Sequence, residues 1–417
     1  MHDRWRHLAG AIAVAFLAGG VRFGVRVARG DAAFWEQSYG FYFDLAQKLV
    51  QEHTFCLDAL TCAYWTPLYP AFLALVTGGE RNFLAIAVAQ SAVGVVTVWC
   101  AYRLARLWFS VPAGWLAAVG TALYPYFVVH DTALQETGLY TAAVALATLA
   151  LALVPVSSRP LWQALLAGSL TGVAMLVRPS LAPVVPLALG WLWWSCQAIS
   201  SNRRWLVVGG YALALLFVLL PWLARNWLVV GRPALTTRLG HSLWIGNNPQ
   251  TFTHYPVESI DRSTAAAWAA MTAAELAEVE RATRCETDLD DWFRARAWAY
   301  IRSHPGATVR GACRKLGAAF WWRLNPVKGR MEQLIYGVSY VPVMLLAGLG
   351  LWLLGRRKNW PALLLCGAHV LAFSLVTMVF WAHTSHRSYL DVYFIVLAAG
   401  ALTSFRQPDD RPLRTWR

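Results

Sequence analysis

Carboxylates, arginines and asparagines stand at the borders of the long apolar runs of this sequence. The acidic candidates for chemistry are Glu36, Asp44, Asp131 and Glu136. The candidates for holding an anion are Arg178, Arg225, Asn226, Asn247, Asn248 and Arg387. A carboxylate can take a proton from an attacking hydroxyl, while guanidinium and N–H groups stabilise the negative charge of a leaving group. Together, the two residue classes can move a proton and hold an anion.

The stretch Pro221–Gln250 begins where a long apolar run ends and contains several of these residues. Its Gly-Asn-Asn-Pro sequence at 246–249 predicts a shaped turn, because Gly and Asn accept left-handed backbone angles and Pro fixes the exit. Asn side chains and freed N–H groups in such a turn can bind a phosphate or a sugar hydroxyl. An ordinary capped turn after a membrane helix explains the same pattern. Upstream of the turn, Arg232–Thr237 predicts a short strand-like piece.

The composition predicts an all-α polytopic membrane protein. Hydrophobic residues make up 58% of the chain and charged residues 14%, and the mean hydropathy is +0.43. The net charge of +14 comes mainly from arginine, which favours membrane edges and anionic lipid, not nucleic acid, as the partner. About ten spans as long as a bilayer is thick are expected. They lie at 8–28, 82–107, 112–129, 134–154, 161–177, 181–199, 205–224, 334–354, 360–382 and 388–404.

The short basic clusters set the predicted topology. If Arg4 and Arg6 are cytoplasmic, alternation of the spans puts the other short basic clusters on the same side, as the positive-inside rule requires. Both termini are therefore expected in the cytoplasm. The prediction divides the chain into an N-terminal transmembrane module (1–224, including an outer loop, 29–81), an extracytoplasmic segment (225–333) and C-terminal transmembrane helices with a cytoplasmic tail (334–417).

The first outer loop combines a predicted interfacial helix with two cysteines. Tyr39–Gln51 has helical spacing with aromatic residues on one face, which favours a helix lying in the interface plane. Asp44 and Lys48 are spaced i,i+4, so an ordinary ion pair is the alternative to a catalytic Asp44. Cys56 and Cys62 either close a small disulfide ring in an oxidising compartment or remain two thiols.

Charged residues at the outer ends of the spans each have two explanations. Glu136 opens an apolar span, where it either faces a cavity or complements the helix dipole. Arg178 ends the fifth span and either serves a site or snorkels to lipid headgroups. Asp290-Asp291 favours capping of a helix start over a divalent metal site, and no cofactor is predicted.

The outer segment is predicted to be mostly helical. Surface helices are expected over 262–283 and 288–303. A third helix over 306–323 is basic and amphipathic, which suits a lipid phosphate or headgroup.

These residues, in this order, resemble the GT-C superfamily of glycosyltransferases. The similarity is to the bacterial family-39-like branch related to dolichyl-phosphate-mannose protein mannosyltransferases and the aminoarabinose transferase of lipid A. The matching marks are Tyr42-Phe43-Asp44-Leu45-Ala46, Pro67-Leu68-Tyr69-Pro70, Glu136, Arg178-Pro179, Pro221-Trp222 through Arg225-Asn226, the 246–249 turn, Trp292…Ala297…Ile301…His304-Pro305 and Arg387.

The resemblance implies a GT-C-like helix bundle and a polyprenyl-phosphate-linked sugar donor. The sugar would pass to a lipid, glycan or protein acceptor on the outer face of a bacterial inner membrane. The residues expected to bind the donor and its lipid phosphate are Arg178, Arg225, Asn226, Asn247, Asn248, Arg387, Tyr42 and Tyr69.

One departure from the family concerns the catalytic base. The family carries an Asp shortly before the Tyr of the interfacial helix, and here that position is Ser38. A hydroxyl is a poor base near neutral pH, so Glu36, just upstream, is the expected base, with Asp131 or Glu136 as a second acid. Asp44 is a further candidate, weakened by pairing with Lys48. A lipid-linked-sugar transporter or flippase, or an inactive homologue that binds lipid phosphate, is the alternative to an enzyme.

Overall fold

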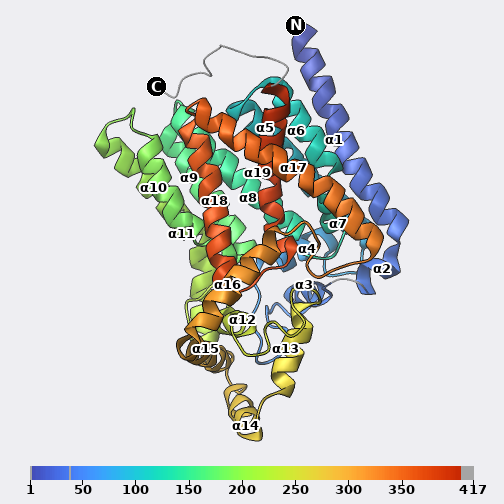
Figure 1. Cartoon of the computed structure of the whole chain (residues 1–417), viewed down its shortest axis with the longest axis vertical. Coiled ribbons are helices and arrows are strands. Elements are labelled where there is room, and N and C mark those ends of the chain that lie inside the picture. Colours follow the sequence, from blue (N-terminus) through green and yellow to red (C-terminus); the bar gives the residue numbers. More distant parts are fainter. Residues whose placement is uncertain (1, 37–38, 405–417) are drawn as a thin grey trace.

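The computed structural model describes residues 2–36 and 39–404, and within them all regular structure is helical (Figure 1). The long apolar elements are α1 (His2–Arg29), α5 (Phe83–Trp108), α6 (Val111–Leu123), α7 (Pro125–Asp131), α8 (Thr137–Leu153), α9 (Pro160–Val177), α10 (Val184–Ser195), α11 (Ser201–Val230), α17 (Arg330–Arg356), α18 (Trp360–Val379) and α19 (Thr384–Ser404). Short 3₁₀ turns, η1 (Val154–Val156) and η2 (Pro179–Leu181), follow α8 and α9.

The ten predicted spans each coincide with one of these helices, the span at 112–129 being the bent pair α6 and α7. Seven helices in the described part of the chain are long and apolar enough to cross a membrane, or eight if the bent pair counts as one span. α10 is shorter, and α19 carries a buried Arg–Asp pair that lowers its mean hydropathy. The chain is a multi-pass helical membrane protein.

The remaining helices gather at one end of the bundle (Figure 1). They are α2 (Asp31–Glu36), α3 (Phe41–Gln51), α4 (Leu68–Thr77), α12 (Leu239–Gly246), α13 (Ile260–Ala269), α14 (Ala273–Ala282), α15 (Glu286–Ser303) and α16 (Pro305–Phe320). The start of α1 and the end of α19 lie at the opposite end (Figure 1). We call the end that carries α3 and α12–α16 the outer end.

Two local expectations for the outer segment are wrong. The single helix expected over 262–283 is two helices, because Thr272 and Glu275 form a capping box that starts α14 afresh. Residues 232–237 form no strand in the described structure, because they meet the first outer loop through only single bonds. Thr237 donates its N–H to Ala63 O at 3.0 Å, and Thr236 Oγ1 donates to Tyr64 O at 2.6 Å.

α19 is the core helix of the bundle and is buried along most of its length against α5, α6, α8 and α17. Elsewhere small residues let helices approach closely. A Cβ on Gly168 of α9 would lie 2.1 Å from the carbonyl oxygen of Tyr211 in α11, so these two backbones touch only because Gly168 has no side chain.

The 53° bend between α6 and α7 is held by an arginine from α1. Pro125 starts α7 and breaks the hydrogen-bond ladder. Arg22 donates to the carbonyls of Ala122 at 3.0 Å and Thr121 at 3.4 Å, and its Nε donates to Asp131 at 2.6 Å. Gly94 makes room for this group, since a Cβ there would lie 2.2 Å from Arg22 Nε. Arg22 is fully buried and fastens the bend.

Candidate functional site

A buried ion pair marks the outer ends of α8 and α9. Glu136 is the N-cap residue of α8, and Arg178 follows the last residue of α9. Arg178 Nε donates to Glu136 Oε1 at 2.8 Å and Nη2 donates to Thr137 Oγ1 at 2.8 Å. Both charged side chains are only 13% exposed. The Tyr42 hydroxyl of α3 lies close enough to lower the pKa of Glu136, so residues of three helices meet at this pair.

Charge and burial oppose each other at this pair. Burial alone would raise the pKa of Glu136, but Arg178 and the hydrogen bonds to the carboxylate outweigh it, and the pKa is lowered. Burial, reinforced by the Glu136 charge, raises the pKa of Tyr42 well above its ordinary value. Glu136 is therefore a carboxylate at neutral pH, and Tyr42 keeps its proton and donates it.

Arg178 has one donor that the protein does not use. Its Nη1 is buried and has no hydrogen-bond partner among the described residues. Arg238 Nε and His383 Nε2 are unpartnered in the same way. An unsatisfied buried donor costs about 1–3 kcal/mol, so a bound anion or hydroxyl would recover that energy.

Electrostatics connect these groups into one site. Arg178 and Arg238 both act on the pKa values of Tyr39 and Tyr42. Burial lowers the pKa of His383 to about 4, with a further contribution from Arg178. His383 is therefore neutral near pH 7 and lies against Trp381, with ring centroids 5.0 Å apart. We call Tyr42, Glu136, Arg178, Arg238 and His383 the outer-face site.

Three residues of this group are among the site residues predicted from the sequence, and two are not. Glu136, Arg178 and Tyr42 were predicted, and the structure brings them together. Arg238 is a single arginine in an irregular loop, and no sequence signal marks it. His383 stands out in the sequence beside His386 and Arg387, but that pattern alone favours interfacial anchoring.

The other predicted carboxylates lie in different surroundings. Asp131 is buried and paired with Arg22 inside the bundle. Asp44 is exposed, and the ion pair expected between Asp44 and Lys48 is wrong, because Lys48 pairs with Glu52 at 3.5 Å, one turn further along α3. Tyr69 packs on Tyr42, with ring centroids 5.1 Å apart, so it lies beside the outer-face site.

Glu36 is exposed at the end of α2, and Ser38 lies outside the described residues. Chain geometry limits how far Glu36 can be from the site. Tyr39 donates its N–H to Leu134 O at 3.2 Å, close to Glu136 in the chain. Three residues of extended chain span at most about 11 Å, so Glu36 starts within that distance of Tyr39.

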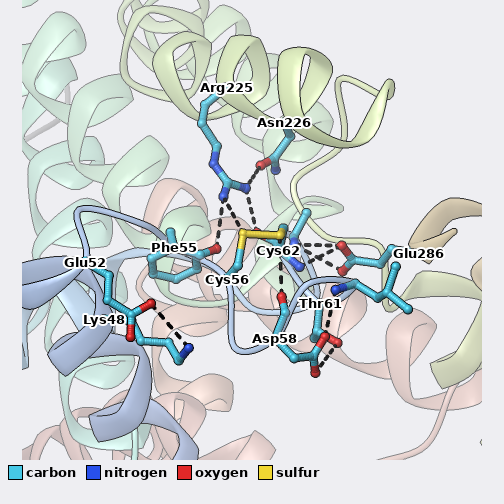
Figure 2. Close-up of a disulfide and its surroundings, with 12 residues drawn as sticks. Lys48, Glu52, Phe55, Cys56, Asp58, Thr61, Cys62, Arg225, Asn226 and Glu286 are labelled. Atoms are coloured by element: carbon cyan, nitrogen blue, oxygen red, sulfur yellow. Dashed lines mark hydrogen bonds and ion pairs between the residues drawn. A yellow bond between two sulfur atoms is a disulfide. The ribbon is translucent and has the colours of Figure 1, made fainter. Parts of the chain in front are cut away.

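Arg225 and Asn226 serve the fold around the first outer loop (Figure 2). Cys56 and Cys62 form a disulfide, which resolves the two alternatives. Arg225 donates to Cys62 O at 2.6 Å, Asn226 Oδ1 at 2.8 Å and Phe55 O at 2.9 Å. Asn226 Nδ2 donates to Ala234 O at 2.7 Å. These contacts use the groups expected to bind a lipid phosphate, so that role stays a prediction.

The asparagine turn and Arg387 are likewise bonded within the protein. Asn247 Nδ2 donates to Leu243 O and Val379 O, and Asn248 Nδ2 donates to Trp244 O. Arg387 is fully buried, with Nε on Asp391 at 3.1 Å and Nη1 on the Ala319 carbonyl at 2.8 Å. Their predicted donor contacts are not tested by these bonds and stay predictions.

Asp290 and Asp291 show how the helix-start prediction fails. α15 begins at Glu286, so both acids lie inside it. Asp290 instead accepts the N–H groups of Gly240 and His241 at the start of α12, and Asp291 pairs with Arg232. An acid at a helix N-terminus satisfies free N–H groups, here those of a neighbouring helix. No group of three metal-ligating side chains occurs among the described residues.

Comparisons with known proteins agree with this architecture. Residues 64–223 match the family of dolichyl-phosphate-mannose-protein mannosyltransferases, and this range includes Glu136 and Arg178. A search of curated proteins finds no match.

Solved structures cover nearly the whole chain. The archaeal oligosaccharyltransferase AglB from Archaeoglobus fulgidus, in complex with an inhibitory peptide and a dolichol-phosphate, has a TM-score of 0.57 and 12% identity over 96% of this chain and 50% of that chain. The Archaeoglobus fulgidus oligosaccharyltransferase tethered to an acceptor peptide has a TM-score of 0.52 and 14% identity, over 96% of this chain and 49% of that chain. ArnT from Cupriavidus metallidurans, bound to undecaprenyl phosphate, has a TM-score of 0.42 and 14% identity, over 96% of this chain and 78% of that chain.

The chain spans about half the length of the oligosaccharyltransferase chains it matches. At these identities the likeness shows the fold. Together with the family match it confirms the resemblance found in the sequence: this is the fold of the GT-C glycosyltransferases.

Proposed function

We propose that the protein is a membrane glycosyltransferase that moves a sugar from a polyprenyl-phosphate-linked donor to a hydroxyl acceptor. The acceptor is a hydroxyl of a lipid, glycan or protein. The observation that carries the proposal is the buried guanidinium of Arg178, held by Glu136 with Nη1 unused. A guanidinium in a partly dry site binds phosphate strongly. The dolichol-phosphate in the related archaeal oligosaccharyltransferase supports this choice of ligand.

In this proposal the residues have separate tasks. Arg178 Nη1 and Arg238 Nε donate to the phosphate as the bond between the anomeric carbon and the phosphate oxygen breaks. The acceptor oxygen forms the new bond to the anomeric carbon, and its proton passes to the Glu36 carboxylate. Glu136 and Tyr42 hold Arg178 in place. The aromatic side chains around Tyr42 and Tyr69 contact the prenyl chain.

The proposed location is a bacterial inner membrane with both termini in the cytoplasm and the outer-face site on the opposite side. A native cysteine can test this topology by labelling. Cys313 on α16 is exposed, whereas Cys100, Cys196 and Cys366 are buried. In a Cys285→Ser background, a membrane-impermeant maleimide should label Cys313 in intact cells. Labelling only after the cells are permeabilised would reverse the topology.

Turnover with defined donors tests the activity. The purified full chain in nanodiscs should release polyprenyl phosphate from at least one polyprenyl-phosphate hexose or pentose when an acceptor hydroxyl is present. Glu36→Gln should lower that rate at least about a hundredfold, the usual scale for a general base, while donor binding persists. Glu80→Gln changes an equally exposed carboxylate of the first outer loop and should have the wild-type rate.

The alternatives give different results in the same assay. If Glu36→Gln turns over normally and Asp44→Asn or Asp131→Asn is inactive in a folded protein, that residue is the base instead. Donor binding without turnover in the wild type would point to an inactive, lipid-phosphate-binding homologue. Movement of the intact donor between leaflets of a liposome would point to a flippase.

A further inference from the structure

A second basic cavity lies on the outer segment, and neither the outer-face site nor the proposed reaction uses it. The cavity has a volume of about 250 Å³ and lies between the 246–248 turn, Phe252 and α16. Arg310 and Arg314 of α16 line it together with Tyr300 and Thr308. Among the described residues that line it, none is acidic.

The two arginines are exposed and have no ion-pair partner in residues 2–36 and 39–404. They stand i,i+4 on one helix, where like charges repel each other. The guanidinium of Arg314 is held over the Phe252 ring at 4.1 Å, which fixes its direction. An anion between the two arginines would remove their repulsion and accept bonds from both.

The surrounding sequence adds to the positive potential. No Asp or Glu occurs between Asp291 and Glu332. Arg294 and Arg296 in that stretch are paired with acids, whereas Arg302, Arg310, Arg314, Arg323, Lys328 and Arg330 have no ion pair among the described side chains. A run of one sign with exposed tryptophans at 298, 321 and 322 is typical of a surface that meets anionic lipid.

The contacts of Lys315 indicate where this cavity lies relative to the membrane. Its Nζ donates to Phe380 O at 2.9 Å and to Val379 O at 3.3 Å, where the α18 span ends. The same Nζ donates to Gly246 O at 3.2 Å, and Gly246 lines the cavity. The cavity therefore lies at the level where α18 leaves the apolar part of the membrane, which is the level of lipid phosphates.

We infer that this cavity binds the phosphate of an anionic phospholipid of the outer leaflet, through Arg310 and Arg314. The size of the cavity suits a phosphate with a small headgroup and leaves the acyl chains in the bilayer. A zwitterionic headgroup is disfavoured because its ammonium would face the same two arginines. Arg310 and Arg314 have no task in the proposed transfer reaction, although Asn247 and Asn248, which also line the cavity, are predicted donor-binding residues.

Native mass spectrometry of the purified full chain with phosphatidylglycerol tests the inference. Arg310→Gln/Arg314→Gln should lower phosphatidylglycerol affinity at least about tenfold, the loss expected for one or two charge-assisted bonds. Arg302→Gln is the matched control, since Arg302 is exposed on α15 and does not line the cavity. Ala307→Phe should fill the cavity and lower affinity equally with every charge retained.

The outcomes separate the sources of the phosphate. Phosphatidylcholine should bind at least tenfold more weakly than phosphatidylglycerol, and millimolar inorganic phosphate should not displace the lipid. Equal affinity of wild type, Arg310→Gln/Arg314→Gln and Ala307→Phe for phosphatidylglycerol would overturn the site. Tight binding of inorganic phosphate alone would overturn its assignment to a lipid.

Discussion

The arginines inside the bundle and the arginines at its outer end are used differently. Arg22 and Arg387 are fully buried, and all three nitrogens of each guanidinium donate to protein acceptors. Arg178 is nearly as buried, yet its Nη1 donates to nothing in the described structure. The first two arginines fasten helices to each other. Arg178 keeps a free donor at the outer end, which is the donor that the proposed function assigns to a ligand.

Among the substitutions, breaking the Arg22–Asp131 pair should have the largest effect. Asp131→Ala leaves a buried guanidinium without its anion, so the free energy of unfolding should fall by about 3–5 kcal/mol. Thermal unfolding in detergent measures it. Arg22→Leu/Asp131→Leu removes both charges and should recover more than half of the loss. An unchanged free energy of unfolding in Asp131→Ala would show that the Arg22–Asp131 pair does not stabilise the helix packing.

Matched lysine substitutions compare the two kinds of arginine directly. Arg387→Lys loses the bonds to Ala319 O and the Tyr336 hydroxyl, so unfolding free energy should fall by about 2–3 kcal/mol. Arg178→Lys keeps a cation beside Glu136 but removes Nη1 and the Nη2 bond to Thr137, so donor affinity should fall about tenfold and the free energy of unfolding by about 1 kcal/mol, less than in Arg387→Lys. Calorimetry and equilibrium binding of a polyprenyl-phosphate sugar measure the two effects. A larger loss of stability in Arg178→Lys than in Arg387→Lys, together with a loss of donor affinity only in Arg387→Lys, would show that Arg387, and not Arg178, binds the donor.

Acidification should weaken the outer end selectively. Burial lowers the pKa of both His241 and His383 to about 4, below the ordinary value of 6.5. Between these values the unfolded chain binds protons that the folded protein does not, so stability falls as pH falls from about 6.5 to about 4. The loss should be on the order of 3 kcal/mol for each of the two histidines. His241→Gln/His383→Gln should flatten this pH dependence, and an unchanged slope would contradict the assignment.

The disulfide of the first outer loop should have a smaller effect than the Arg22–Asp131 pair. Cys56→Ser/Cys62→Ser opens only a short ring, so the chain-entropy estimate is a loss of about 2 kcal/mol. Urea unfolding with and without reductant measures it, and reductant should not affect the double variant. A loss as large as that of Asp131→Ala would mean that the loop, and not the bundle, limits stability.

Local sequence patterns predicted the helices, whereas contacts between residues far apart in the sequence determine which side chains meet at the candidate site. Apolar length, which is a local property, located a helix at each of the ten predicted ranges. Seven helices, or eight spans with the bent pair, are long and apolar enough to cross a membrane in the described structure. Sequence could not choose between Asp44 and Glu52 as the partner of Lys48, since both are four residues away. It could not show that Asp131 belongs to Arg22, which is 109 residues distant. Arg238 carries no pattern at all, and only the folded loop places it over the Tyr64 ring, where its charge also acts on the pKa of Tyr42.

The carboxylate of Glu286 joins the two outer segments in a way that restricts the path of a substrate. It accepts the N–H groups of Cys62 at 2.8 Å and Ala63 at 3.0 Å, and also the hydroxyl of Thr237. Releasing it at every turnover would strand a charge and three donors, at a cost of several kcal/mol. Glu286 therefore holds the first outer loop and the segment after α11 together. Under the proposed function, a prenyl-linked donor would enter from the side of the bilayer and the acceptor from the aqueous side, without breaking these bonds.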